Sequence, residues 1–221
     1  MIYVHIPFCK SFCTYCGFYS EICDDKVQNL FMSSLLDEIR SRREELPCTG
    51  HSPATLYIGG GTPSLLSAQA LGQIVSALGS GPYEEFTVEV NPEDIVTKGE
   101  DYVRALLALG VNRISMGVQS FDDGILRWMN RRHDASGARK AFGILRGAGV
   151  GNISIDLIFG LSQLSDDQWE GTVAEALALG PEHISAYQLS VEDGSALSRT
   201  VSEDRYREAS DEQCRRQYDI M

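Results

Sequence analysis

The chain of 221 residues has no apolar run approaching the roughly 20 residues that a helix needs to cross a bilayer. It shows neither a basic leader nor a cleavable apolar stretch at its start, so we expect a cytoplasmic protein without a transmembrane segment. Basic residues are also scarce: 19 Lys and Arg stand against 31 Asp and Glu, a formal net charge of -12. The chain therefore has no cationic excess to displace counterions from a phosphate backbone, and nucleic acid is not an expected partner.

Low-complexity segments are absent, and the chain has no internal repeat beyond an alternation of strand-like and helix-like stretches. This alternation is typical of repeated βα units around a parallel sheet. Six strands are expected, and several read as continuous apolar runs, as buried parallel strands do. They are Ile2-Ile6, Thr55-Ile58, Phe86-Val90, Arg113-Gly117, Ile153-Ile158 and His183-Leu189. The helices are expected at about Asp25-Leu46, Ala68-Leu78, Lys98-Leu109, Gly137-Ala148 and Asp166-Leu179.

Six units rather than eight favour an α/β fold of the incomplete (β/α)6 TIM-like barrel type, with parallel strands. In such a barrel the site forms at the C-terminal ends of the strands. We expect the core to occupy residues 1–194 and a C-terminal helical tail to occupy residues 195–221, with one helix at about Glu203-Tyr218. From the abrupt end of the sequence we expect this tail to be the start of a missing C-terminal domain.

Cysteine is rare, yet three of the six cysteines, Cys9, Cys13 and Cys16, lie within eight residues of one another. In a reducing compartment this grouping indicates metal ligation rather than a disulfide. The C-x3-C-x2-C spacing places three thiolates on the loop after the first strand, one ligand short of a closed zinc site. A cubane iron-sulfur cluster with three Cys ligands instead keeps one iron open. The remaining cysteines are expected to be structural: Cys23, Cys48 and Cys214.

A zinc site that also uses His5 is the alternative, because thiolate ligands alone do not separate zinc from iron-sulfur. Phe12 and Tyr15 favour the cluster, since aromatic side chains can shield it from water and tune its potential. We expect His5 to pack or to form a hydrogen bond nearby.

Further candidate residues follow the other strands. Residues 59–63, Gly-Gly-Gly-Thr-Pro, come directly after the second strand, and consecutive glycines let the backbone approach a ligand closely, although a plain turn is the alternative. Glu89 lies near the C-terminal end of the third strand, where a helix cap or an Arg partner would also explain it. Asp156 is a lone acid in an apolar strand, and a ligand or an Arg would offset the cost of burying it.

Gln119 lies just after the fourth strand, and its amide can donate and accept hydrogen bonds. Arg131 follows on the next helix, where it could bind a carboxylate in bidentate fashion or remain a solvated helical Arg. Ser190 follows the sixth strand.

The cysteine motif, with an aromatic residue before its third Cys, resembles the defining motif of the radical SAM superfamily. The longer string Tyr3-Val-His-Ile-Pro-Phe-Cys9 resembles the oxygen-independent coproporphyrinogen III oxidases and the related HemW heme chaperones. The resemblance spans about residues 2 to 192, with its motifs in order.

This resemblance implies a [4Fe-4S] cluster on the three cysteines. The free iron would bind S-adenosylmethionine (SAM) through its amino and carboxylate groups, and one electron would then cleave the sulfonium to a 5'-deoxyadenosyl radical. For Tyr3, packing within the strand is the alternative. The residues that the resemblance assigns to cofactor binding are Tyr3, Tyr15, Gly60, Gly61, Thr62, Glu89, Gln119, Arg131, Asp156 and Ser190.

Three functions remain open: a HemW-type heme chaperone, a coproporphyrinogen III oxidase, and a zinc-stabilised structural domain. The oxidases carry a further Cys two residues after the third ligand, and Phe18 stands there in this chain, as in the chaperones. Departures from the family are Gly160-Leu-Ser in place of Gly-Leu-Pro, and the absence of a His-Asn-x-x-Tyr-Trp type segment associated with heme handling. Implied partners are heme or a porphyrinogen, a reductant such as flavodoxin or ferredoxin, and a heme-acceptor protein.

Overall fold

The computed structural model describes residues 1–45, 55–79 and 81–221. Its centre is a sheet of six strands in the order β1-β2-β3-β4-β5-β6, and each strand pairs in parallel with the next. All six expected strands are confirmed to within two residues at each end. Their bounds are β1 Ile2–Ile6, β2 Thr55–Gly60, β3 Glu85–Val90, β4 Arg113–Gln119, β5 Ile153–Phe159 and β6 His183–Gln188.

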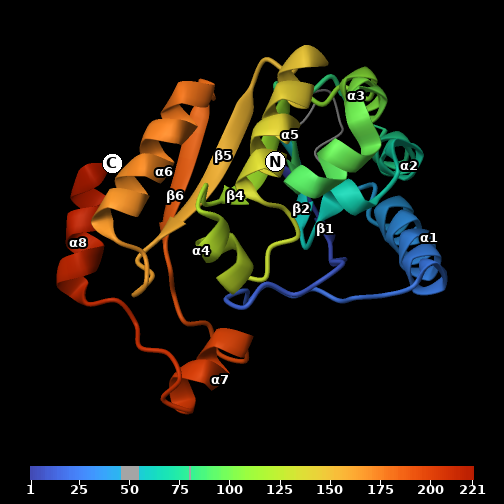
Figure 1. Ribbon diagram of the computed structural model, residues 1–221. Coiled ribbons are helices and arrows are strands. Elements are labelled where there is room, and N and C mark those ends of the chain that lie inside the picture. Colours follow the sequence, from blue (N-terminus) through green and yellow to red (C-terminus); the bar gives the residue numbers. More distant parts are fainter. Residues whose placement is uncertain (46–54, 80) are drawn as a thin grey trace.

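The sheet does not close, because β1 and β6 lie at its two edges. Figure 1 shows helices α6 and α8 beside one end of the sheet and helices α1 and α2 beside the other. The incomplete parallel barrel is therefore confirmed. The helices are α1 Asp25–Ser41, α2 Ala68–Leu78, α3 Pro92–Ala108, α4 Asp123–Trp128, α5 Ala135–Gly147, α6 Asp166–Leu179, α7 Ala196–Ser202 and α8 Asp211–Ile220, with a 3-10 turn, η1, at Pro63–Leu65.

Helix α3 starts six residues before the expected position, because the Asn91 side chain accepts a hydrogen bond from the backbone N–H of Glu93 and Pro92 fits the first helical turn. A kink interrupts the helix at Gly99, whose φ of 70° and ψ of -171° form a backbone conformation open almost only to glycine. The pattern that predicted a helix from Lys98 onward describes mainly the part after this kink.

Three other expectations about helices are corrected. Helix α1 ends at Ser41, earlier than expected; Leu46, the expected end, and Cys48 lie outside the described residues. Helix α4 is a short separate helix, so Arg131 lies in the turn after it rather than on a helix. The tail contains two helices instead of one, because the chain turns at Asp204, whose φ is 54°, and restarts where Ser210 caps α8.

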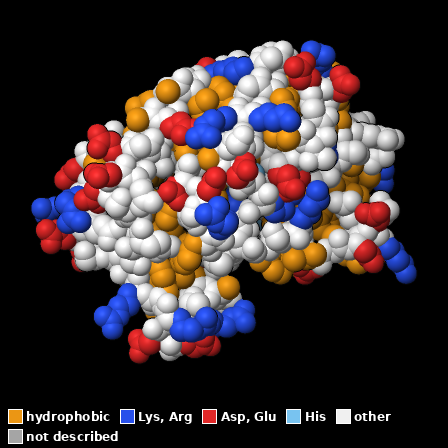
Figure 2. Space-filling view, in the orientation of Figure 1, with side chains coloured by type: hydrophobic (Ala, Val, Ile, Leu, Met, Phe, Trp, Pro, Cys, Tyr) orange, Lys and Arg blue, Asp and Glu red, His pale blue; other side chains and the backbone are white. Residues whose placement is uncertain are grey.

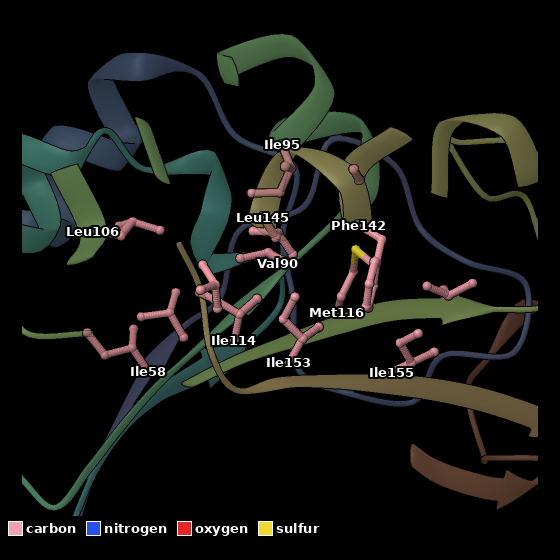
Figure 3. Close-up of a cluster of buried hydrophobic side chains, with 14 of the residues drawn as sticks. Ile58, Val90, Ile95, Leu106, Ile114, Met116, Phe142, Leu145, Ile153 and Ile155 are labelled. Carbon is pink, nitrogen blue, oxygen red and sulfur yellow. The ribbon is translucent and has the colours of Figure 1, made fainter. Parts of the chain in front are cut away.

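The core lies between the sheet and its covering helices. Figure 3 shows Ile95 and Leu106 of α3, with Phe142 and Leu145 of α5, above apolar residues of the strands. Ile114, Met116, Ile153 and Ile155 are almost fully buried there. Because side chains alternate along a strand, the residues next to these four in β4 and β5 face the opposite side of the sheet. Those residues are polar: Arg113, Ser115, Ser154 and Asp156.

The tail packs against the core through Gln217 of α8, which is fully buried. Its side-chain oxygen accepts a hydrogen bond from the backbone N–H of Gly160 at 2.8 Å, and its backbone oxygen accepts one from Trp169 Nε1 at 2.8 Å. Cys214 of the same helix is also buried. The domain boundary at residue 194 stays a prediction.

None of the described helices is long and apolar enough to cross a membrane. Acidic and basic side chains are interspersed over the face shown in Figure 2, with small apolar patches between them. This face therefore carries no broad patch of a single charge.

His133 predicts a pH dependence of stability. It is buried, with Nε2 3.1 Å from the carbonyl oxygen of Val118, and burial lowers its pKa from 6.5 to about 3. Because the unfolded chain takes up this proton near pH 6.5 and the folded chain does not, the residue costs stability as the pH falls below 6.5. The difference in unfolding free energy between the wild type and His133→Gln should change by about 1.4 kcal/mol per pH unit below pH 6.

Denaturant unfolding at pH 7.5, 6.0, 5.5 and 5.0 would measure this difference. As the pH falls, the unfolding free energy of the wild type is expected to decrease relative to that of His133→Gln. Parallel pH curves for the two proteins would mean that the imidazole is protonated in the folded state as readily as in the unfolded chain.

Candidate functional site

A cavity of about 710 Å3 opens at the C-terminal ends of the strands. Its size suits a small-molecule ligand, since such sites usually measure about 300 to 1,000 Å3. The residues predicted from the sequence converge on it, with the exception of Tyr3. Those that line the cavity are Cys9, Cys13, Tyr15, Cys16, Gly60, Gly61, Thr62, Glu89, Gln119, Arg131, Asp156 and Ser190.

The three cysteines lie on the cysteine loop, residues 8–20, directly after β1. Backbone hydrogen bonds fix this loop: Cys9 N–H donates to Glu21 O at 3.0 Å, and Cys16 N–H to Cys13 O at 3.3 Å. All three thiols are free and partly exposed, and burial raises the pKa of the Cys16 thiol. The loop thus presents its soft ligands along one wall of the cavity.

The spacing of the thiols bears on which metal group they suit. Among the described residues, no three His, Cys, Asp or Glu side chains converge as closely as one metal ion would need. A [4Fe-4S] cluster makes no such demand, because each thiolate binds a different iron atom. His5 is engaged elsewhere, with Nδ1 3.0 Å from Tyr3 Oη and Nε2 3.1 Å from the carbonyl oxygen of Tyr19. These are the nearby hydrogen bonds expected for His5.

The turn after α4 supports the cysteine loop from the other side. Asn130 Nδ2 donates to the carbonyl oxygen of Phe12 at 2.7 Å, and Thr14 N–H donates to the carbonyl oxygen of Met129 at 3.1 Å. The Thr14 hydroxyl adds a hydrogen bond to the carbonyl oxygen of Trp128 at 3.0 Å. The sequence analysis missed these contacts, because they join residues more than 110 positions apart.

Arg131 reaches from the same turn into the cavity wall. Its guanidinium donates to Cys13 Sγ at 3.3 Å and to the carbonyl oxygen of Gly117 at 2.5 Å. The Nε atom is buried and has no hydrogen-bond partner among the described residues. A solvated helical Arg is therefore the wrong interpretation, since this cation lies beside a predicted ligand and keeps one donor for another group.

Glu89 connects β3 to the glycine segment, residues 59–63. Its two carboxylate oxygens accept hydrogen bonds from Tyr57 Oη at 2.7 Å and from Gly60 N–H at 3.0 Å. Burial raises the pKa of Glu89, while these two hydrogen bonds lower it. Within residues 1–45, 55–79 and 81–221, Glu89 neither caps a helix nor pairs with an Arg.

The glycines of this segment are needed where the chain passes close to itself. Gly60 has a φ of 117°, in the region that favours glycine. A Cβ atom at Gly61 would lie 2.7 Å from the carbonyl oxygen of Phe8 in the cysteine loop. The close approach seen here is to the protein's own backbone, and a direct ligand contact stays a prediction.

Gln119 and Asp156 complete the inner wall. Gln119 has a φ of 70° at a break in the β4 register, a strained conformation for a residue with a side chain. Such strain concentrates at functional sites. Asp156 accepts a hydrogen bond from Ser115 Oγ at 3.1 Å, and burial raises its pKa. Two carboxylates with raised pKa values therefore lie in one cavity, as is typical of functional sites.

Of the two remaining candidate residues, Ser190 lines the cavity and Tyr3 does not. Tyr3 is 52% exposed, its hydroxyl contacts His5, and it does not line the cavity. Ser190 lines the cavity and donates to Glu192 at 2.6 Å.

Arg113 also lines the cavity, and the sequence analysis did not select it, although the polar alternation along β4 was a signal for it.

The radical SAM superfamily matches residues 3–176. The heme chaperone HemW of Lactococcus lactis subsp. lactis is 36% identical over 195 residues, covering 86% of this chain and 49% of that protein. HemW of Escherichia coli is 34% identical over 197 residues, covering 86% of this chain and 50% of that protein.

Among solved structures, coproporphyrinogen III oxidase (HemN) from Escherichia coli, described as a radical SAM enzyme, superposes with a TM-score of 0.83 at 26% identity. The match covers 99% of this chain and 50% of that one. The chain spans about half the length of the curated relatives it matches.

Proposed function

Because this chain belongs to the radical SAM superfamily, we propose that Cys9, Cys13 and Cys16 hold a [4Fe-4S] cluster whose remaining iron binds SAM in the cavity. The observation that carries the proposal is convergence: the three thiols and the polar residues at the strand ends line one cavity. Thiolates are the ligands that such clusters use, and three of them leave one iron for an outside ligand.

The residues around the thiols suit this cofactor. Arg131 donates to Cys13 Sγ, and hydrogen bonds to cluster sulfurs are one of the ways in which a protein sets the cluster's potential. Its free Nε gives a buried donor for a carboxylate. When bound, the cluster would supply the electron that cleaves the sulfonium bond of SAM.

The protein's own residues would bind and orient SAM. Gly60, Gly61 and Thr62, held by Glu89, would meet its amino group, because this segment borders the cysteine loop. Gln119 and Asp156 offer an amide and a carboxylate deeper in the same wall. Tyr15 of the cysteine loop and Ser190, which follows β6, also line the cavity and would contact SAM there.

For the whole protein, we propose the role of a heme chaperone of the HemW class. The HemW relatives are 34% and 36% identical to this chain, while the superposed oxidase is 26% identical. Phe18, which is 76% exposed and lines the cavity, stands where the oxidases carry their additional Cys. Heme would be the cargo, a flavodoxin or ferredoxin the electron donor, and a heme-requiring protein the acceptor. The reducing cytoplasm would keep the thiols available for iron.

Two assays on the cluster-loaded protein test this role. Heme titration, followed by the Soret absorbance, is expected to give saturable binding. Incubation with coproporphyrinogen III, SAM and a reductant under anaerobic conditions is expected to give no vinyl product. Vinyl formation would establish the oxidase instead, and absence of both heme binding and product would contradict the chaperone role. Heat-denatured protein at the same iron content serves as the control for adventitious heme association.

A further inference from the structure

A buried carboxylate outside the cavity joins the segments that build it. Asp94 lies in the first turn of α3, and its side chain is 1% exposed. It accepts a hydrogen bond from Ser64 Oγ at 2.7 Å and two from the Arg132 guanidinium, each at 3.0 Å. Lys10 Nζ lies 3.8 Å from the same carboxylate. These partners fully engage both oxygens.

Each partner belongs to a different segment of the site. Ser64 lies in η1, immediately after the glycine segment; Arg132 follows Arg131 in the turn after α4; and Lys10 follows Cys9 in the cysteine loop. Asp94 itself follows β3, the strand that carries Glu89. One carboxylate therefore connects the chain segments after β1, β2, β3 and β4.

Further contacts from α3 fix the segment next to the glycines. Lys98 Nζ donates to the carbonyl oxygens of Ser64, Leu65 and Leu66 at 2.5, 3.1 and 2.8 Å. The Tyr102 hydroxyl donates to the carbonyl oxygen of Leu66 at 3.2 Å. The η1 turn is thus held by several directional bonds, so its position follows that of α3.

The bidentate ion pair between Arg132 and Asp94 fixes the position of the turn after α4 relative to α3. Arg and a carboxylate make two parallel hydrogen bonds that fix distance and direction together. A buried pair of this kind gives little net stability compared with apolar packing. Arg132 also donates to Glu93 at 2.7 Å, so loss of the Asp94 charge removes the bidentate contact but leaves the guanidinium one carboxylate. The pair joins α3 to the residue beside Arg131, and neither Asp94 nor Ser64 lines the cavity.

We propose that Asp94 is a positioning residue that sets the placement of the glycine segment relative to Arg131, and thereby the affinity for SAM. This inference rests on the proposed function for its SAM readout. A second readout, which needs no cofactor, tests the connection itself.

The first experiment measures SAM binding to the cluster-loaded protein by calorimetry. Asp94→Asn is expected to retain its iron and to bind SAM at least tenfold more weakly. Ser64→Ala removes the hydroxyl's bonds to Asp94 and to the backbone N–H of Asn91 but leaves the ion pair, and it is expected to weaken binding about threefold. Asp101→Asn is the matched control on the same helix, because Asp101 is fully exposed, and it should bind SAM as the wild type does. Wild-type affinity in both Asp94→Asn and Ser64→Ala would overturn the inference.

The second experiment is amide hydrogen exchange on the metal-free protein. Asp94→Asn is expected to speed exchange in two separate segments, at Leu65 and Leu66 and at Arg131, while β5 keeps its protection. Faster exchange in only one segment, or a uniform rise across the sheet, would overturn the connection. A wild type that holds iron yet binds no SAM would instead refute the proposed function, and hydrogen exchange would still decide the role of Asp94.

Discussion

Cys13→Ala is expected to reduce bound iron from about four atoms per chain to almost none after anaerobic reconstitution. The structure places Cys13 between its two partner thiols along the loop, with Arg131 donating to its sulfur at 3.3 Å. Removing this thiol leaves two cysteines on the cavity wall, which is too few to retain a cubane cluster that already has one open iron. Because the loop's backbone hydrogen bonds do not involve the side chain of Cys13, the fold should persist.

The matched control is Cys23→Ala. Cys23 is also a free, partly exposed thiol close in sequence to the cluster motif, but it does not line the cavity. This variant should keep its iron, sulfide and brown colour. Iron and sulfide analysis, with circular dichroism to verify folding, distinguishes the two proteins. A Cys13→Ala protein that retains full iron, or a Cys23→Ala protein that loses it, would contradict the assignment of the ligands.

Gly61→Ala is expected to destabilise the protein by about 2 to 3 kcal/mol and to abolish SAM binding. The added Cβ would lie 2.7 Å from the carbonyl oxygen of Phe8 and 3.0 Å from its carbonyl carbon and nitrogen. These are backbone atoms of the cysteine loop, so no side-chain rotation can relieve the contact. The two segments must separate, which moves the glycine segment away from the thiols.

Gly143→Ala provides the comparison within helix α5. A Cβ at Gly143 would meet nothing within 4 Å, and alanine favours the helix by about 1 kcal/mol. Denaturant unfolding of both variants, followed by SAM titration of the reconstituted proteins, measures the contrast. Equal stability and equal SAM affinity would show that the close approach of Gly61 to Phe8 has no energetic consequence.

Sequence reasoning was strongest where local pattern and tertiary structure agree. Strands such as Ile153–Phe159 are buried apolar runs, so their positions could be predicted from residue type alone. Since parallel strands all end at the same edge, the polar residues that follow them were expected together, and the cavity confirms this convergence. Tyr3 is different because it lies near the start of β1. It faces the same side of the sheet as its register partner Tyr57, which lines the cavity, but the cavity opens at the other end of the strands.

The remaining features depend on contacts between distant residues. Asn130 bonds to the cysteine loop and Arg132 to Asp94 only because the fold brings their turns together, and no local pattern records this. The start of α3 could have been predicted, since Asn91 followed by Pro92 is a readable cap signal that the sequence analysis did not use. The break in the tail at Asp204 had no equivalent signal, because polar residues continue through it.

The most direct test of this account is an EPR spectrum of the reconstituted, reduced protein, recorded with and without SAM. The account predicts a signal from a reduced [4Fe-4S] cluster that changes when SAM is added, because SAM would bind the iron that has no Cys ligand. A colourless protein that holds zinc, or a cluster whose signal is unaffected by saturating SAM, would contradict it.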